Sequence, residues 1–242
     1  MNQEVIDRFS FSVLSVSVCE NGKDDSMIAN AFVWDYTDSE VLILTNYHTW
    51  KSEEFKYCFP PKPKQKVGRK RKVSDNDYQD PVTIVLHNSD DNFEHKFVVT
   101  EDLFKYVDES DDFAVLKLPK AGFAMQRIPV SLGVSTTLRI HAIGYVGHTG
   151  MFNVTGGEVS GLIPDGFTMN LLSAPGFSGA AVIADHTGRA VGYMGGNLDA
   201  SHHKNSQHQS YGYRFDKVLR DTNRQHSPAN SPAGKGESSS TV

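Results

Sequence analysis

The chain has 242 residues, a formal net charge of −5, and 38% hydrophobic, 22% charged and 10% aromatic residues. These fractions are typical of a globular protein and exclude a wholly disordered chain. The longest apolar runs are about four residues, whereas a bilayer-spanning helix needs roughly 20. We therefore expect no transmembrane helix and no membrane partner. The length allows one large domain or two smaller ones.

The N-terminal residues and the cysteines bear on the cellular compartment. Acidic residues occur early, at Glu4 and Asp7, and no long apolar stretch follows them, so the N-terminus is unlike a secretory signal. The two cysteines, Cys19 and Cys58, allow one disulfide but no disulfide framework. We therefore expect an intracellular protein, located in the cytoplasm, the nucleus or both.

Positive charge is concentrated in one segment. Seven Lys and Arg residues lie between Pro61 and Lys72 with no acidic residue among them, and subtracting them from −5 leaves −12 for the rest of the chain. An acidic body with one basic segment is not typical of a nucleic-acid binder, so we expect no nucleic-acid partner. The cluster from Arg69 to Lys72 is of the type that importins bind, although a solvated loop without a receptor explains it nearly as well.

Short apolar runs of β type, separated by turn residues, dominate the sequence. The first six predicted strands span residues 11–18, 28–34, 41–45, 82–86, 96–100 and 113–118. The second six span residues 138–144, 152–159, 167–172, 180–184, 190–194 and 211–215. We therefore predict an all-β fold in which two six-stranded antiparallel barrels pack together.

These two sets of strands predict the domain organisation. The first barrel is expected within residues 1–120, with a Pro- and Lys-rich exposed loop at 60–80, and the second within 121–222. Asp216 is expected to cap a short helix that ends the second barrel. Residues 223–242 are rich in Ser, Pro and Gly and are expected to form a disordered tail. The last three residues, Ser240-Thr241-Val242, fit a pattern that PDZ domains bind.

Three short segments carry residues suited to nucleophilic catalysis. His48 follows an apolar strand, Asp112 precedes another, and Ser178 lies between Gly176 and Gly179. Taken singly, each has an ordinary explanation as a strand end or turn residue. A serine nucleophile needs a base, and a histidine base needs a carboxylate, so this set in an all-β chain indicates a triad. The glycines allow a turn whose N–H groups converge to form an oxyanion hole.

The three segments resemble the signatures of the trypsin-like (chymotrypsin-fold) serine peptidases. Residues 44–48, L-T-N-Y-H, are similar to the L-T-N-x-H of the HtrA-like and bacterial glutamyl-endopeptidase branch, while D-F-A-V-L and G-F-S-G match D-φ-A-φ-L and G-x-S-G. The resemblance implies a catalytic triad of His48, Asp112 and Ser178, with the backbone N–H groups of Gly176 and Ser178 as oxyanion donors. It also implies hydrolysis of protein or peptide substrates through an acyl-enzyme, without a cofactor. About 20 residues follow the second barrel, so we expect no PDZ domain.

The resemblance also implies a primary specificity pocket. It places Leu172 at the base of this pocket, Met194, Gly195 and Gly196 on its wall, and Gly212 on the strand that closes it. Because no acid stands at the base, we expect an uncharged pocket that accepts apolar or small side chains. Three histidines beyond the wall strand, His202, His203 and His208, are expected to lie in a solvated loop rather than to bind a metal.

Some positions depart from the family pattern. Ala180 replaces the usual second glycine after the serine, Tyr47 replaces a small residue, and Phe177 stands where digestive relatives carry the aspartate used in zymogen activation. Since Phe177 cannot pair with an N-terminal ammonium, we expect it to be buried in the second barrel and the intact chain to need no proteolytic activation. The alternatives are a trypsin-like fold retained as an inactive protein-binding module, and a non-protease β-protein with a basic nucleic-acid arm.

Overall fold

The computed structural model describes residues 3–20, 23–51, 82–88, 93–147, 149–197 and 209–224. Several predictions concern residues outside these ranges: those on Cys58, on the exposed loop at 60–80 with its basic cluster from Arg69 to Lys72, on the histidines of the 202–208 segment, and on the tail from residue 225 with the C-terminal Ser240-Thr241-Val242. Within the described ranges, no helix is long and apolar enough to cross a membrane.

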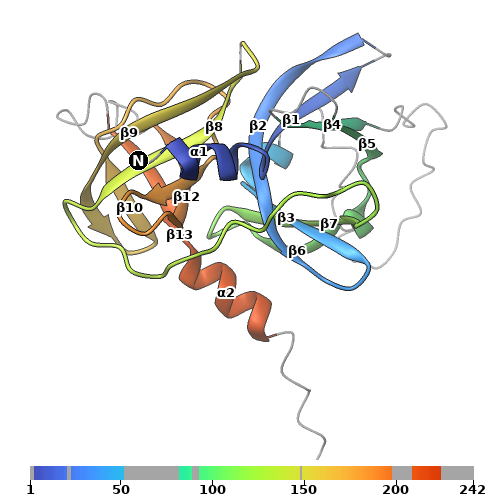
Figure 1. Cartoon of the computed structure of the whole chain (residues 1–242). Helices are drawn as coiled ribbons and strands as arrows, with labels where there is room; N and C mark the ends of the chain where they lie inside the picture. Colours follow the sequence, from blue (N-terminus) through green and yellow to red (C-terminus); the bar gives the residue numbers. More distant parts are fainter. Residues whose placement is uncertain are drawn as a thin grey trace, which may run out of the picture.

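The first half of the chain forms an antiparallel sheet of seven strands (Figure 1). The strands are β1 (Val13–Glu20), β2 (Lys23–Tyr36), β3 (Glu40–Thr45), β4 (Thr83–His87), β5 (Glu94–Val98), β6 (Phe104–Asp108) and β7 (Phe113–Pro119). Their order in the sheet is β5-β4-β1-β2-β3-β7-β6. β3 and β7 are neighbours, so the end of β3 and the start of β7, which flank His48 and Asp112, lie at the same end of the sheet.

The second half of the chain forms a closed barrel with the order β10-β13-β12-β11-β8-β9. Its strands are β8 (Arg139–Val146), β9 (Met151–Ile163), β10 (Gly166–Met169), β11 (Ala181–Ala184), β12 (Arg189–Asn197) and β13 (Ser210–Arg214). Two α-helices complete the described part of the chain: α1 (Gln3–Ser10), which lies between the two halves in Figure 1, and α2 (Phe215–Arg224), which continues from β13.

The all-β fold and the short C-terminal helix are confirmed, and three details differ from the prediction. The first half is a seven-stranded sheet whose end strands β5 and β6 pair on one side only, rather than a closed six-stranded barrel. β6 was missed because its five residues lie between the acidic segments 101–102 and 108–112, which favour turns. α1 was also missed: among its eight residues only Phe9 is a buried apolar one, too weak a pattern to indicate a helix.

Apolar side chains form three buried clusters, and one of them joins the two halves. The first cluster lies on one face of the seven-stranded sheet, and the third fills the barrel. The second contains residues of both halves, among them Phe32 and Trp34 on β2, Tyr193 on β12 and Phe215 at the start of α2. Burial of large apolar side chains stabilises by about 1.5–3 kcal/mol each, so this shared cluster is the main apolar contact between the halves.

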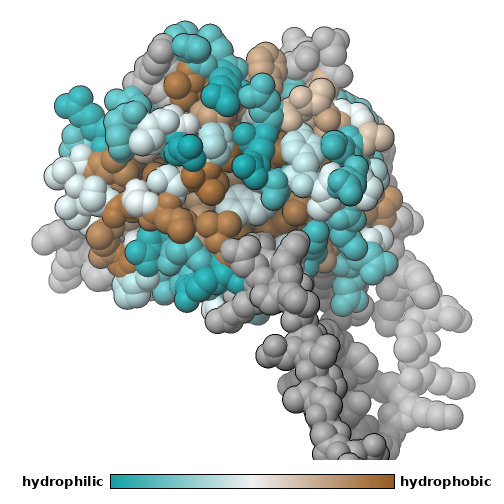
Figure 2. All heavy atoms as spheres, turned by 60° about the horizontal axis from the view of Figure 1, so that its bottom comes forward, coloured by the Kyte–Doolittle hydropathy of each residue, from teal (hydrophilic) through white to brown (hydrophobic). Residues whose placement is uncertain are grey.

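Some apolar side chains remain on the surface. Figure 2 shows brown, apolar residues in a band across the face that it brings forward, bordered by hydrophilic residues. The large apolar side chains that are exposed in the described residues are Phe11, Val98, Val107, Leu132, Met151, Leu162, Ile163 and Leu172. Singly exposed apolar side chains are normal in globular proteins, because polar residues cannot cover the whole surface.

Asn30, a fully buried residue of β2, links the sheet to the barrel by hydrogen bonds. Its Nδ2 donates to the carbonyl oxygens of Tyr145, at 3.0 Å, and Gly176, at 2.8 Å, while its Oδ1 accepts the N–H of Tyr145 at 2.6 Å. Its backbone N–H donates to the carbonyl of Ser178 at 2.7 Å, and its carbonyl accepts the Thr45 hydroxyl at 2.8 Å. Both polar atoms of the buried Asn30 side chain therefore have hydrogen-bond partners, in β8 and in the loop that carries Ser178.

We expect Asn30→Ala to lower the free energy of unfolding by at least about 2 kcal/mol, because it leaves buried carbonyl and N–H groups of Tyr145 and Gly176 without a partner. Urea unfolding followed by tryptophan fluorescence measures the change. Ser160→Ala is the control, since Ser160 bonds only the Thr168 hydroxyl at an exposed position of the barrel. An Asn30→Ala variant as stable as the wild type would contradict this account of the contact between the halves.

Candidate active site

His48 and Asp112 form a directly hydrogen-bonded pair. His48 begins the 3₁₀ helix η1 (His48–Lys51), three residues after β3 ends. Its Nδ1 lies 2.7 Å from Oδ2 of Asp112, and its backbone N–H donates to Oδ1 of the same carboxylate at 2.7 Å. An ionised carboxylate only accepts hydrogen bonds, so Nδ1 carries the proton and Nε2 keeps a lone pair. The His48 side chain is 45% exposed, which leaves this basic nitrogen accessible.

The Asp112 side chain is only 11% exposed and is held by further donors. Asn46 Nδ2 donates to Oδ2 at 3.1 Å, and the Tyr47 N–H donates to the Asp112 carbonyl at 3.2 Å. Asp112 itself has a φ of 50°, in the left-handed region that Asp and Asn tolerate better than most other residues. These contacts fix both oxygens of the carboxylate, and they single out Asp112 rather than Asp111 as the partner of His48.

The barrel presents neutral phenol groups toward this carboxylate. Burial raises the pKa of Tyr193 well above its ordinary value, and the negative charge of Asp112 adds to the effect. Burial and then Asp112 likewise raise the pKa of Tyr213. The two rings stack, with 5.4 Å between their centroids. The hydroxyl groups of Tyr193 and Tyr213 therefore stay protonated and place no competing negative charge near the His48–Asp112 pair.

Ser178 lies in the segment between β10 and β11, which is shaped by two glycines. The N–H of Phe177 donates to the carbonyl of Ala174 at 3.0 Å, and Gly176 has a φ of 83°. A turn with Pro175 second and a positive-φ glycine third is typical of type II. A Cβ on Gly176 would lie 2.5 Å from the Cα of Gly147, and so close a contact excludes any side chain there.

The second glycine, Gly179, is required for the approach of the two halves. Its φ is 81°, and a Cβ there would lie 2.0 Å from the carbonyl oxygen of Asn30. The N–H of Asn30 donates to the carbonyl of Ser178, so the sheet and the loop that carries Ser178 touch at this point through backbone atoms. A side chain at residue 179 would separate them.

Within the turn from Gly176 to Ala180, two backbone N–H groups have no acceptor among the described residues. The N–H groups of Phe177, Gly179 and Ala180 donate to the carbonyls of Ala174, Met194 and Phe177, whereas those of Gly176 and Ser178 donate to none. Unpaired backbone N–H groups are rare in folded proteins unless water or a ligand binds them. Gly176 and Ser178 are the two residues predicted as oxyanion donors, and both are partly accessible.

The Ser178 hydroxyl is turned toward the barrel. Its Oγ donates to the carbonyl of Gly195 at 3.3 Å, and within the described ranges no hydrogen bond joins it to His48. The structure therefore shows the predicted contact of His48 with Asp112 but not the predicted contact with Ser178. A serine hydroxyl changes acceptors by rotation about its single Cα–Cβ bond, and catalytic hydrogen bonds often tighten only when substrate binds.

Phe177 is buried as predicted. It is 2% exposed and packs in the apolar cluster of the barrel, beside Val146 and Met194. Ala180 and Ala181, where the family pattern has glycine and proline, are completely buried in the interior. The segment is therefore anchored on both sides of Ser178 by packing.

The predicted pocket needs correction at two residues. Leu172 is 77% exposed, so it is not the base of an enclosed pocket; it lies on the surface, three residues beyond the end of β10. Met194 is completely buried in the interior of the barrel, where it packs near Phe167 and Phe177, so it does not form a pocket wall. The pairing of β12 with β13 is irregular at this point, with a register shift between Met194 and Gly196.

The three predicted pocket glycines lie close to aromatic rings. A Cβ on Gly195 would come within 2.2 Å of the Tyr211 ring, and Gly196 is paired with Tyr211 across β12 and β13. Gly212 is paired with Met194, and a Cβ there would approach the Phe167 ring to 3.0 Å. Tyr211 and Tyr213, which the pocket prediction did not include, thus both have rings that lie against Gly195.

Comparisons with known proteins agree with the fold described above. A family model described as "Trypsin-like peptidase domain" matches residues 29–192, which include His48, Asp112 and Ser178. A search of curated proteins finds no match. Among solved structures, "Crystal structure of Deg5" is similar, with a TM-score of 0.61 and 18% sequence identity over 90% of each chain, which shows a shared fold. Because the family match covers more than half of the chain, this protein belongs to the trypsin-like peptidase family.

Proposed function

We propose that this protein is a serine endopeptidase with Ser178 as nucleophile, His48 as general base and Asp112 as the carboxylate that orients His48. The observation that carries the proposal is the 2.7 Å contact between His48 Nδ1 and the largely buried Asp112 carboxylate, whose other oxygen accepts the His48 N–H. The two unpaired N–H groups of Gly176 and Ser178 support it, because a hydrolase of this kind needs donors for an oxyanion.

The reaction follows from these positions. Ser178 Oγ rotates from the Gly195 carbonyl to Nε2 of His48 and attacks the carbonyl carbon of the substrate, while its proton passes to Nε2. The substrate oxygen becomes an oxyanion, which the N–H groups of Gly176 and Ser178 bind. Asp112 stabilises the resulting imidazolium. His48 then protonates the leaving amine, and a water molecule, deprotonated by His48, hydrolyses the acyl-enzyme and frees Ser178.

A second function rests on one observation. Ser178 Oγ bonds the Gly195 carbonyl rather than His48, as expected if the fold served only to bind proteins. The two candidates differ in a simple way: a peptidase needs its serine to become a nucleophile, whereas a binding module does not. Reactivity of Ser178 therefore separates them.

The intact chain should react with a serine-directed fluorophosphonate, and mass spectrometry should map the adduct to Ser178. Ser178→Ala should abolish labelling, and Asp112→Asn should slow peptide hydrolysis by on the order of 10⁴-fold, because the amide favours the wrong tautomer of His48. Ser160→Ala, at an exposed serine of the barrel, is the matched control and should label like the wild type. Full activity in Ser178→Ala would refute the peptidase, and an unlabelled wild type would favour the binding module.

The intact chain should also hydrolyse peptides without N-terminal trimming, because buried Phe177 anchors the Pro175-Gly176 turn by packing. Phe177→Ala should lower kcat by on the order of 10²-fold, approaching the loss of one oxyanion donor, with a much smaller change in KM. Phe177→Leu, which retains most of the volume, should lose less. The control is Leu132→Ala, at a side chain that is 56% exposed. Activity that appears only after trimming of the N-terminus would contradict this account.

A further inference from the structure

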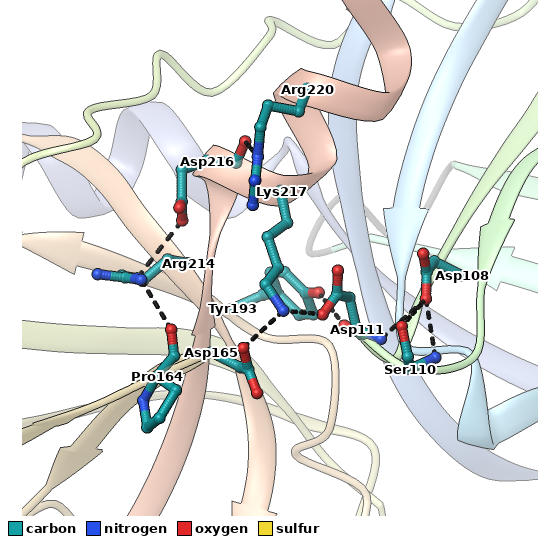
Figure 3. Close-up of polar contacts among 10 residues, drawn as sticks. All are labelled: Asp108, Ser110, Asp111, Pro164, Asp165, Tyr193, Arg214, Asp216, Lys217 and Arg220. Carbon is teal, nitrogen blue, oxygen red and sulfur yellow. Dashed lines mark hydrogen bonds and ion pairs between the residues drawn. The ribbon is translucent and has the colours of Figure 1, made fainter. Parts of the chain in front are cut away.

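The loop that leads into Asp112 is rigid on the side of its own sheet. Asp108, at the end of β6, accepts three hydrogen bonds at Oδ1: from the N–H of Ser110 at 2.8 Å, from its hydroxyl at 2.6 Å, and from the N–H of Asp111 at 2.9 Å (Figure 3). Hydrogen bonds to Ser110 and Asp111 outweigh the effect of burial and hold the pKa of Asp108 below its ordinary value. The ionised Asp108 carboxylate therefore stabilises the turn by accepting these hydrogen bonds.

The barrel holds the same loop from the other side. The hydroxyl of Tyr193, a residue of β12 that is 1% exposed, donates to the carbonyl of Asp111 at 3.0 Å. This carbonyl belongs to the peptide unit that joins Asp111 to Asp112. The orientation of that unit helps to set the unusual φ of 50° at Asp112, and therefore the direction in which its carboxylate points.

The helix α2 supplies a cation to this loop. Lys217 Nζ forms an ion pair with the Asp111 carboxylate and a second one, at 2.6 Å, with Oδ1 of Asp165 in the turn between β9 and β10 (Figure 3). The side chains of Lys217 and Asp111 are 21% and 14% exposed. Burial alone would lower the pKa of Lys217, but its hydrogen bonds to the two carboxylates outweigh this and raise it, so the ammonium stays charged.

The start of α2 is fixed, so Lys217 cannot easily move away. Phe215 is completely buried, and its ring lies 6.0 Å from that of Phe32 and 5.2 Å from that of Trp34, both on β2. Arg214 donates to the carbonyl of Pro164 at 2.9 Å and pairs with Asp216 at 3.4 Å, as Figure 3 shows. The helix is thus attached to the sheet by aromatic packing and to the barrel strand β13 by the Arg214–Asp216 ion pair.

Four carboxylates, those of Asp108, Glu109, Asp111 and Asp112, lie within five residues of the chain; Glu109 pairs with Lys51, and Asp165 lies nearby. Like charges this close repel each other, and a partly buried carboxylate without a cation is costly. Lys217 is the cation that pairs with Asp111 and Asp165. Without it, Asp111 would favour a position closer to water, and the peptide unit shared with Asp112 would move with it.

We propose that Lys217 is a positioning residue for the catalytic acid: by pairing with Asp111 it holds the Asp108–Asp112 loop in the conformation that aims Asp112 at His48. This inference rests on the proposed peptidase function. By this proposal, the start of α2, which follows β13, contributes to the alignment of His48. Lys217 contacts neither Ser178 nor His48 in the described structure, so its effect passes through Asp111.

The test is a set of variants in the full chain, assayed for peptide hydrolysis and thermal unfolding. Lys217→Met should lower kcat by about 10- to 100-fold, because small displacements of catalytic groups cost factors of this size. KM should stay within about twofold, since none of these groups touches substrate. Lys217→Arg keeps the charge and should recover most of kcat. Two controls should retain wild-type kcat: Arg220→Met, one turn further on the same helix, and Asp165→Asn, which removes the other partner of Lys217.

The double variant of Lys217 and Asp111 shows whether Lys217 acts by positioning Asp112 or only by stabilising the fold. Lys217→Met combined with Asp111→Asn should lose less activity than the product of the two single losses, because both act through one pair. If Lys217→Met does not fold, Asp111→Asn gives the same test, since it breaks the pair while Lys217 keeps Asp165 as a partner. A wild-type kcat in Lys217→Met, with the wild type labelled by fluorophosphonate, would overturn this inference alone. A wild type that is inert would overturn the proposed function as well.

Discussion

The hydrogen bonds of Asn30 hold the loop that carries Ser178 against the seven-stranded sheet, and the rest of the site depends on this contact. His48 and Asp112 come from the sheet, whereas Ser178 comes from a loop of the barrel. Two bodies that meet through apolar packing alone can slide, because dispersion contacts have little directional preference. Asn30 adds directional bonds to the carbonyls of Gly176 and Ser178, and Gly179 provides the space for this approach.

A second set of contacts between the halves holds the loop that carries Asp112. Tyr193 donates a hydrogen bond to the Asp108–Asp112 loop, and Lys217 forms an ion pair with it. Both contacts lie at the end of the interface where α2 begins. The partners of both links are buried or nearly so, where a hydrogen bond is stronger and an unpaired polar group is more costly than in water. The apolar cluster of Phe32, Trp34 and Phe215 excludes water from the same interface. Polar contacts thus define the alignment, and apolar packing supplies much of the stability.

The sequence allowed some of these features to be predicted and not others. Local motifs identified His48, Asp112 and the loop of Ser178, because each is encoded within five residues. Asn30 and Lys217 were missed, since their partners lie 146 and 106 residues away and their own surroundings look ordinary. An asparagine inside the apolar run of β2 was the one available signal. The resemblance placed Leu172 and Met194 in the pocket, whereas the first is exposed and the second is buried in the barrel, because burial depends on tertiary packing that a short motif does not encode.

A crystal structure of the chain after reaction with a peptidyl phosphonate tests the central claim most directly. We expect a covalent bond from Ser178 Oγ to phosphorus. One phosphonyl oxygen should lie about 3 Å from the N–H groups of both Gly176 and Ser178, and His48 should still be bonded to Asp112. An adduct whose oxygen lies away from these two N–H groups, or a Ser178 that stays unmodified and bonded to the Gly195 carbonyl, would contradict the account.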